Sequence, residues 1–398
     1  MSQGVKIIAH LLFSWLVFSN IMSSVNAEYF NVIHYGALGD GTSDDSLAFL
    51  EAWEAACSTR TENSTVIIPE NKTFLVYPVS FSGPCKAKNI TFLILGKIVG
   101  PISPLAWEGI NPSLWLTFNG INGLNISGSG IIDGRGSGWW NQSCRDHPGL
   151  AVNILSCNAS NVRGVHVMNS PQTHILVMDS NRVDIRQVTI RAPGSSPNTD
   201  GIHIHSSRNV NISQIDIGTG DDCVSVGDST SNINISDVKC GPGHGISIGS
   251  LGRGGNFVKV ENIHVSNAYF NRTTNGARIK TWQVGKGYVR NVTFENLYFN
   301  SVENPVIIDQ YYCNVRGTCK EQQSGVHITN VTFSNLFGTS LSSVAVSLHC
   351  SHYVACTGIF FNSVQLTSAK AGSEVTSSCS NAQGFAFRMV QPEHCLKI

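Results

Sequence analysis

The chain has 398 residues, its formal net charge is zero, and only 13% of its residues are charged, against roughly 25% in an average soluble domain. This balance excludes a broad basic surface for nucleic acid, so an anionic partner must be bound by a local cluster of cations. We expect no nucleic-acid partner, and we expect a monomer.

Residues 1–27 have the pattern of a secretory signal peptide: Lys6 precedes the apolar run 7–18, and small residues end at Ala27. The run is too short to span a bilayer, and no later segment offers about 20 uninterrupted apolar residues. The sequence predicts a signal peptide that is removed on export, no membrane span, and a single secreted domain over 28–398.

Cysteine and asparagine usage also indicates export. All twelve cysteines follow residue 27, and no C-x-x-C pair occurs, so disulfides formed in an oxidising compartment are expected. Glycosylation sequons support export more weakly, because asparagine is also common in turns. The sequons begin at Asn63, Asn71, Asn89, Asn125, Asn141, Asn158, Asn211, Asn234, Asn271, Asn291 and Asn330.

One segment near the start of the mature chain has helical spacing. The stretch "SLAFLEAWEAAC" over 46–57 is amphipathic, and Ser43 or Asp44 is placed to cap it. The acids Asp40, Asp44 and Asp45 lack the terminal glutamate of a calcium loop, so we interpret them as capping residues.

Beyond about residue 90, short β-rich pieces recur with a period near 22 residues; Ile202, Val224 and Ile246 occupy equivalent positions. A repeat with three short strands and no helix predicts an all-β fold, a right-handed parallel β-helix of about ten coils. The helix over 44–57 is expected to cap its N-terminal end, and the tail from Cys350 its C-terminal end.

The same period places ionisable residues in one column. Asp200, Asp222 and His244 lie 22 residues apart, so stacking brings their side chains within about 5 Å of one another. Asp221 adds a third acid, and a purely structural ladder would avoid such repulsion. At least one pKa is expected to be raised, which gives the proton donor and the ionised base that glycosidic cleavage requires.

Two geometric expectations follow. The acids face outward only if Gly201, Cys223 and Gly245 form a corner, because strict alternation would turn Asp200 inward. Asp221 is offset along the chain, so we expect it to project away from the other acids, at the roughly 6.5 to 9.5 Å that suits an inverting enzyme.

Other polar and aromatic residues are candidates for substrate contacts. Arg278 and Lys280 face outward together and would bind an acidic substrate and offset the repulsion between the acids. His203 and His205 form an H-x-H pair without a third ligand at matching spacing, so we expect no metal. Trp282 is a possible sugar platform, although a single aromatic residue is more often a packing residue.

Four motifs, "NTD" (198–200), "GDD" (220–222), "GHG" (243–245) and "RIK" (278–280), resemble in order and spacing the signatures of the polygalacturonases, glycoside hydrolase family 28, of the plant type. The resemblance implies a secreted enzyme of the plant cell wall without a cofactor. It also implies hydrolysis of the α-1,4-galacturonosyl linkages of pectin, with inversion.

The resemblance assigns catalytic roles to five residues. Asp221 is implied to be the general acid, and Asp200 and Asp222 to position and deprotonate the attacking water. His244 is implied to support the protonation of the acid or to bind nearby, and Asn198 to line the site.

The resemblance also implies that Arg278 and Lys280 hold the substrate carboxylate, and that Tyr312 in "QYYC" is the family's conserved tyrosine. Cys223 and Cys240 resemble a disulfide pair of the family.

Three alternatives remain open. The enzyme is exo-acting rather than endo-acting if loops close the groove. A non-catalytic polyuronide-binding solenoid would share the groove, although the three intact acids argue against it. A pectate lyase on a similar coil would need calcium and a basic proton abstractor.

Overall fold

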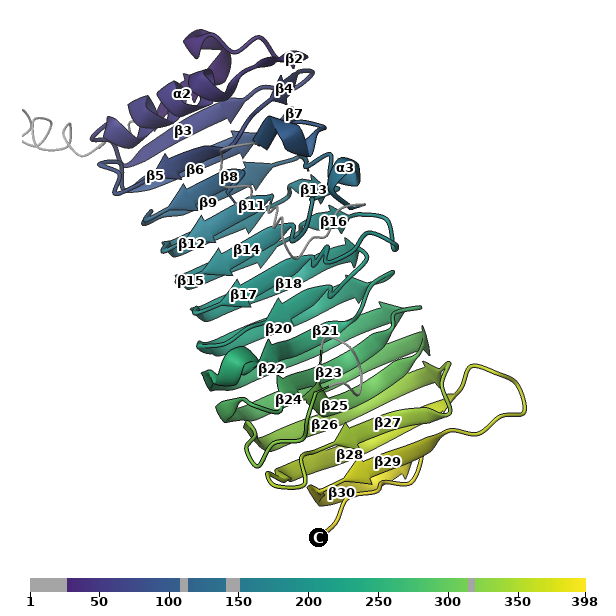
Figure 1. Ribbon diagram of the computed structural model, residues 1–398. Coiled ribbons are helices and arrows are strands. Elements are labelled where there is room, and N and C mark those ends of the chain that lie inside the picture. The colour runs from purple at the N-terminus through teal and green to yellow at the C-terminus, as the bar shows by residue number, and fades with distance from the viewer. Residues whose placement is uncertain (1–26, 108–113, 141–150, 314–318) are drawn as a thin grey trace, which may run out of the picture.

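The computed structural model describes residues 27–107, 114–140, 151–313 and 319–398, and these residues form a right-handed parallel β-helix (Figure 1). Its stacked coils run in one direction from the N-terminal helix to the C-terminus. The predicted signal segment, apart from Ala27, lies outside the described residues, as do Asn141 and Cys144.

One long sheet contains eleven strands, and every strand pairs in parallel with its neighbours. The sheet therefore adds one strand for each coil, close to the predicted ten coils. Its strands are β5 (Val79–Ser82), β8 (Leu116–Asn119), β11 (Val152–Leu155), β14 (Ile175–Met178), β17 (Ile202–His205), β19 (Val224–Val226), β21 (Ile246–Leu251), β23 (Asn275–Trp282), β25 (Asn304–Tyr312), β27 (Val344–His349) and β29 (Thr376–Ser380).

The remaining nineteen strands form the second, bent sheet. They are β1 (Ala27–Asn31), β2 (Asp40–Asp44), β3 (Asn63–Ile68), β4 (Thr73–Leu75), β6 (Asn89–Ile94), β7 (Lys97–Val99), β9 (Leu124–Gly128), β10 (Ile131–Asp133), β12 (Asn158–Arg163), β13 (His166–Met168), β15 (Asn181–Arg186), β16 (Thr189–Arg191), β18 (Arg208–Gly218), β20 (Thr230–Cys240), β22 (Phe257–Asn271), β24 (Lys286–Val302), β26 (His327–Ser340), β28 (Cys356–Ser368) and β30 (Ala382–Gln391).

The prediction of three short strands per coil holds only in the N-terminal half. From β18 onward the second and third strands merge into one bent strand, as in the 17-residue β24. The bend is a single residue with positive φ, such as Asp237 (54°) or Asn296 (54°). Asn and Asp tolerate this left-handed conformation, so the chain turns a corner without ending its hydrogen-bonded ladder.

The backbone register confirms the predicted stack. Ile202 pairs with Val224, and Val224 pairs with Ile246. Each of these side chains is fully buried, and the ladder continues to Ala277 in the next coil. The packing of apolar side chains inside the coils thus determines which residues of neighbouring coils lie next to each other on the outer surface.

The predicted helix is present as α2 (Ser46–Ser58), and it covers the N-terminal end of the stack (Figure 1). Trp53 contacts Phe81 and Phe118 at ring-centroid distances of 5.3 and 5.9 Å, and Phe49 contacts Phe92 at 6.2 Å. This aromatic cluster closes the core where no further coil follows. The other helices are short: η1 (Val32–Tyr35), η2 (Pro104–Trp107), α3 (Ser137–Trp140) and η3 (Arg253–Gly255).

The capping prediction is displaced by one residue. Asp45 is the N-cap residue, but its carboxylate accepts from the amides of Leu38 (2.7 Å) and Gly39 (3.2 Å) in the preceding loop. Asp44 accepts from the first amide of the helix at 2.9 Å. The acid cluster therefore ties the helix to its loop.

The C-terminal prediction is wrong in part. Residues after Cys350 do not form a separate cover, because β28, β29 and β30 continue the parallel stack. Disulfides Cys350–Cys356 and Cys379–Cys395 link parts of these final coils. The remaining pairs among the described cysteines are Cys57–Cys85, Cys223–Cys240 and Cys313–Cys319.

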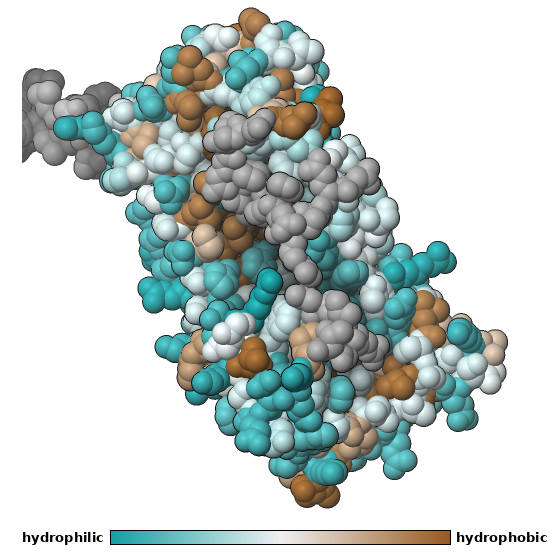
Figure 2. Space-filling view, in the orientation of Figure 1, coloured by the Kyte–Doolittle hydropathy of each residue, from teal (hydrophilic) through white to brown (hydrophobic). Residues whose placement is uncertain are grey.

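The outer surface is mainly polar. An asparagine ladder crosses the coils, with each Nδ2 donating to the Oδ1 of the previous member; its members are Asn158, Asn181, Asn209, Asn232, Asn262, Asn291 and Asn330. Figure 2 shows hydrophobic side chains scattered among hydrophilic ones on the viewed face. None of the helices in the described ranges is long and apolar enough to cross a membrane.

Candidate active site

One cavity of about 410 Å³ brings together every catalytic and substrate-binding residue that the family resemblance implied. It lies on the outer face of the eleven-stranded sheet, where the 22-residue register places the acids. The predicted residues that line it are Asn198, Asp200, Asp221, Asp222, His244, Arg278, Lys280 and Tyr312.

Tight turns before β17 and β19 position the acids. The Thr199 hydroxyl accepts from the amide of Gly220 at 3.0 Å and donates to the Ser196 carbonyl at 3.0 Å. A Cβ at Gly220 would lie 1.9 Å from the Ser196 carbonyl oxygen, so only glycine permits this approach. The "NTD" and "GDD" turns are thus bound directly to each other.

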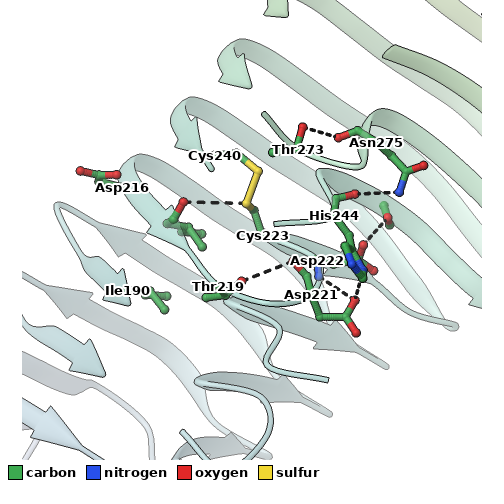
Figure 3. Close-up of a disulfide and its surroundings, with 12 residues drawn as sticks. Ile190, Asp216, Thr219, Asp221, Asp222, Cys223, Cys240, His244, Thr273 and Asn275 are labelled. Carbon is green, nitrogen blue, oxygen red and sulfur yellow. Dashed lines mark hydrogen bonds and ion pairs between the residues drawn. A yellow bond between two sulfur atoms is a disulfide. The ribbon is translucent and has the colours of Figure 1, made fainter. Parts of the chain in front are cut away.

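The predicted corner is also present. A Cβ at Gly201 would lie 2.5 Å from the Cys223 carbonyl oxygen, and Gly245 has φ +86°. Cys223 is fully buried and forms its disulfide with Cys240, as the family resemblance implied. Figure 3 shows this disulfide beside the turn that carries Asp221 and Asp222.

Asp222 is buried, with an exposed fraction of 2%, and two cations hold it. Its Oδ1 accepts from Arg278 Nη2 at 2.6 Å and from the Ser247 hydroxyl at 2.8 Å, and its Oδ2 accepts from Lys280 Nζ at 2.9 Å. Burial alone would raise the pKa of Asp222, but the charges of Arg278 and Lys280 lower it to about 2. Asp222 is therefore ionised at any pH at which the protein would work.

Asp200 has the opposite electrostatic environment. Burial raises its pKa well above the usual value, and the neighbouring charges of Asp221 and Asp222 raise it further. The Ser225 hydroxyl donates to Asp200 Oδ2 at 2.6 Å, and His203 Nδ1 lies 2.6 Å from the same hydroxyl. The sequence predicted a carboxyl with a raised pKa beside an ionised carboxylate. Asp200 has the raised pKa, and Asp222 is the ionised partner.

A buried histidine supports the backbone at Asp200. His174 is fully buried, its Nδ1 lies 2.9 Å from the Asp200 carbonyl oxygen, and its Nε2 accepts from the Ser170 amide at 3.3 Å. Burial lowers the pKa of His174 to about 4, so the ring is neutral at mildly acidic pH. This arrangement fixes the turn without adding charge.

Asp221 does not project away from Asp222, so the expectation is wrong for that pair. One ligand atom each from Asp221, Asp222 and His244 lie within 4.8 Å of one another. Asp221 Oδ1 accepts from the Asp222 amide at 2.8 Å and lies 3.0 Å from His244 Nδ1, which draws the carboxyl back (Figure 3). Among the described residues, Asp221 Oδ2 has no hydrogen-bond partner.

Two further predicted residues form the wall of the cavity. The Tyr312 ring lies 5.4 Å from Lys280 Nζ and packs edge-on against Trp282 at 5.5 Å, whereas Tyr311 lines a different cavity. Asn198 is exposed at the rim. Trp282 is thus a packing residue behind Tyr312 and does not line the cavity.

The three clustered ligand atoms raise the question of a metal ion. Both oxygens of Asp222 already accept from Ser247, Arg278 or Lys280, and the two positive charges oppose a divalent cation. The contacts therefore suit proton transfer better than cation binding. The absence of a metal stays a prediction.

Sequence reasoning missed the serines of the site. Ser225 and Ser247 contact Asp200 and Asp222, and both lie in the outward row that contains His203. The 22-residue register contained this signal, because Ser225 and Ser247 stand three positions after the aligned residues Asp222 and His244, as His203 does after Asp200.

The family model for glycosyl hydrolases family 28 matches residues 57–391. The chain belongs to glycosyl hydrolase family 28. It is 43% identical over 390 residues to a probable polygalacturonase of Arabidopsis thaliana, covering 96% of this chain and 83% of the relative. A polygalacturonase of Chamaecyparis obtusa is 42% identical over 372 residues, covering 90% and 71%.

Solved structures share the fold of this family 28 chain. An endo-xylogalacturonan hydrolase of Aspergillus tubingensis matches with TM-score 0.77 and 22% identity, covering 91% of this chain and 99% of that one. An exopolygalacturonase of Thermotoga maritima matches with TM-score 0.75 and 21% identity, covering 91% of each. Both likenesses concern the β-helix alone.

Proposed function

We propose that this family 28 glycoside hydrolase is a polygalacturonase that cleaves the α-1,4-galacturonosyl linkages of pectin and polygalacturonate. The observation that carries the proposal is one cavity holding an ionised acid, a carboxyl of raised pKa and two cations, which suit an anionic glycan. The relatives' names, all polygalacturonases among those described above, support the same substrate.

Asp222 is the base in this proposal, because the cations hold it ionised while it faces the cavity. Asp221 is the proton donor, since its Oδ2 is unbonded and its carboxyl is more exposed (21%) than that of Asp222. Asp200, neutral through its raised pKa, holds the attacking water without repelling the substrate. His244 fixes the orientation of the donor through Asp221 Oδ1.

The cations also bind the substrate. Arg278 commits Nε to Ser247 and Nη2 to Asp222, and Lys280 commits one donor to Asp222. A guanidinium has five N–H donors and an ammonium has three, so both retain donors for a galacturonate carboxylate. Tyr312 and Asn198 border the sugar from the wall and the rim.

We propose attack by water with inversion. Asp222 has its oxygens engaged by Ser247, Arg278 and Lys280, and a neutral Asp200 is a poor nucleophile. The short Asp221–Asp222 separation does not by itself favour inversion. The proposal rests instead on the hydrogen bonds that already occupy both carboxylate oxygens of Asp222.

Secretion to the cell wall completes the proposal. Five disulfides join ten of the eleven described cysteines, Cys157 being a buried free thiol, and such bonds persist in oxidising compartments. The signal pattern over 1–27 indicates the same route. We propose that the mature chain acts as a monomer without a cofactor.

Hydrolysis of polygalacturonate, measured as new reducing ends, tests the activity. We expect turnover that persists with chelator, no ultraviolet-absorbing unsaturated product, and loss of turnover in Asp222→Asn. Chelator-sensitive formation of unsaturated product would instead identify a lyase, and binding without cleavage a non-catalytic solenoid. Product sizing after brief digestion separates endo from exo cleavage.

A further inference from the structure

A second cavity, of about 370 Å³, lies beside the first on the outer face of the eleven-stranded sheet. In the backbone register Lys280 pairs with Asp309, and Asp309 pairs with His349. Asp309 and His349 both line the second cavity. Because neighbouring coils are about 4.8 Å apart, this cavity begins one coil beyond Lys280, towards the C-terminal end.

The charged groups of the second cavity differ from those of the first. Among the described residues its lining includes the acids Asp309 and Glu321 and the basic side chain of His349, but neither lysine nor arginine. Asp309 Oδ1 accepts from the Tyr311 amide at 2.9 Å, and Glu321 Oε1 accepts from the Tyr311 hydroxyl at 3.2 Å. His352 Nδ1 also lies 2.9 Å from Glu321 Oε1. Within the part of the chain that the structure describes, no partner contacts the second oxygen of Asp309 or of Glu321.

An unpartnered buried acceptor lies at the same place. Gln283 lines the cavity with an exposed fraction of 8%, and its Oε1 has no hydrogen-bond partner among the described residues. This oxygen is itself covered by protein atoms, so it is not offered to a ligand at the surface of the cavity. The cavity therefore presents two acceptor groups, the carboxyls of Asp309 and Glu321, to a ligand that carries donors.

An aromatic surface completes the cavity. The Tyr311 and His349 rings lie 4.5 Å apart, tilted by 32°, and both line the cavity together with Ile307. Aromatic and aliphatic side chains pack against apolar faces of ligands while acceptors at the edge orient them. Ring faces flanked by hydroxyl acceptors suit a pyranose.

We propose that this second cavity is a sugar subsite that binds an uncharged pyranose unit of the glycan and disfavours a free galacturonate. The proposal rests on the polygalacturonase function, since the same chain must lie across both cavities. The unit is a methyl-esterified galacturonate or a neutral sugar within the polymer, because either offers hydroxyl donors without a carboxylate.

Charge explains the selectivity. A free carboxylate in the second cavity would face Asp309 and Glu321, and juxtaposed like charges oppose binding. Esterification removes that charge but keeps the hydroxyl groups that donate to the two acids. The first cavity, with Arg278 and Lys280, selects the opposite kind of unit.

The test compares kcat/KM on oligogalacturonides of one length, free or partly methyl-esterified, for the full chain and for Asp309→Asn. An asparagine at this position still accepts from the Tyr311 amide, so the turn is retained. Glu303→Gln is the matched control, because it removes an exposed acid from the same coil at the start of β25, away from the cavity. A polymer with alternating neutral sugars forms the third substrate.

We expect the unmodified protein to prefer the esterified substrate or the one with neutral sugars, and whichever it prefers identifies the unit. Asp309→Asn should reduce that preference by about tenfold, mainly by improving the free substrate, and Glu303→Gln should leave it unchanged. An unchanged preference in folded Asp309→Asn and Glu321→Gln overturns the subsite while the proposed function stands. Failure of the unmodified protein to cleave any of the substrates overturns both.

Discussion

Lys280 Nζ lies 2.9 Å from Oδ2 of Asp222, and Arg278 binds the other oxygen of the same carboxylate. One pair of cations therefore has two effects. It keeps a buried base ionised, and its remaining donors face the cavity in which the substrate carboxylate would bind.

Replacing Lys280 by methionine should change both binding and pH dependence. The KM for polygalacturonate should rise, because one carboxylate ligand is lost. A base works only when ionised, so activity falls as the pH drops through its pKa. Loss of the cation raises the pKa of Asp222, so the acid limb of the kcat profile should move to higher pH by about one unit.

Lys239→Met is the control for this change, because Lys239 is an exposed lysine on β20, in the other sheet. It should leave the KM and the acid limb unaltered. An acid limb that stays in place in Lys280→Met would show that Asp222 is not the titrating base.

The proton donor can be identified by leaving-group chemistry. Asp221→Asn should lower kcat on polygalacturonate by about 10²- to 10⁴-fold without loss of the fold, because the change is nearly isosteric. An oligogalacturonide with a nitrophenyl leaving group needs no protonation, so it should lose far less. Asp222→Asn should lose activity on both substrates, since the base is needed for each.

The same comparison tests Asp200, whose raised pKa makes it the competing donor. Asp200→Asn keeps a neutral side chain that can hold water, so its two substrates should be affected alike. If kcat were close to that of the unmodified protein on the nitrophenyl substrate in Asp200→Asn, but not in Asp221→Asn, the proton donor would be Asp200.

The hydrogen-bond chain from His203 through Ser225 to Asp200 should affect the alkaline limb of the pH profile of kcat. In Ser225→Ala, Asp200 loses a donor that stabilises its ionised form, so its pKa rises and the alkaline loss of kcat should move to higher pH. The kcat itself should fall by roughly two- to tenfold, the value of one hydrogen bond. Ser225→Thr should restore both properties, and Ser378→Ala, on the distant strand β29, should change neither.

Sequence periodicity predicted the stack because burial fixes register. Ile202, Val224 and Ile246 must all face inward, so the residues two positions earlier fall into one column. These residues are Asp200, Asp222 and His244. The fold of Asp221 back towards His244 was not predictable, because it depends on a hydrogen bond from the neighbouring amide. The spacing of residues along a sequence does not predict such a local hydrogen bond between a side chain and the backbone.

The two ends of the chain show a similar contrast. The amphipathic, helical spacing of residues 46–57 identified the N-terminal cap. The C-terminal coils escaped prediction because β29, "TSSCS", lacks the apolar alternation of the earlier strands. Its place in the stack is set by pairing with β27 and by Cys379–Cys395, neither of which leaves a local pattern.

Two disulfides of similar span allow a matched test. Cys223–Cys240 and Cys379–Cys395 join residues 17 and 16 positions apart, so replacing either pair by serines should cost about 3 kcal/mol of unfolding free energy. Only the first change should also lower kcat, because Cys223 directly follows Asp222. Urea titrations and kcat measured well below the unfolding transition give the two readouts. Equal activity losses would show that the first disulfide acts through global stability alone.

The stereochemistry of the product tests the role of Asp222 most directly. Its oxygens accept from Ser247, Arg278 and Lys280, so it is better placed to take a proton from water than to attack carbon. Burial and the charges of Asp221 and Asp222 raise the pKa of Asp200, which disfavours the anionic form that a nucleophile needs. Direct attack by water inverts the anomeric centre, so the first product from the α-linked polymer should be the β-anomer.

Proton NMR of a fresh digest, recorded before mutarotation, measures the anomer directly. Asp221→Asn acting on the nitrophenyl substrate is the useful control, since this reaction needs no proton donor and should give the same β-anomer if water attacks opposite the leaving group. An initial α-anomer, or a glycosyl adduct trapped on Asp200 or Asp222, would require a carboxylate nucleophile. Such a result would mean that the contacts of Asp222 break during the reaction, while the fold and the substrate class would stand.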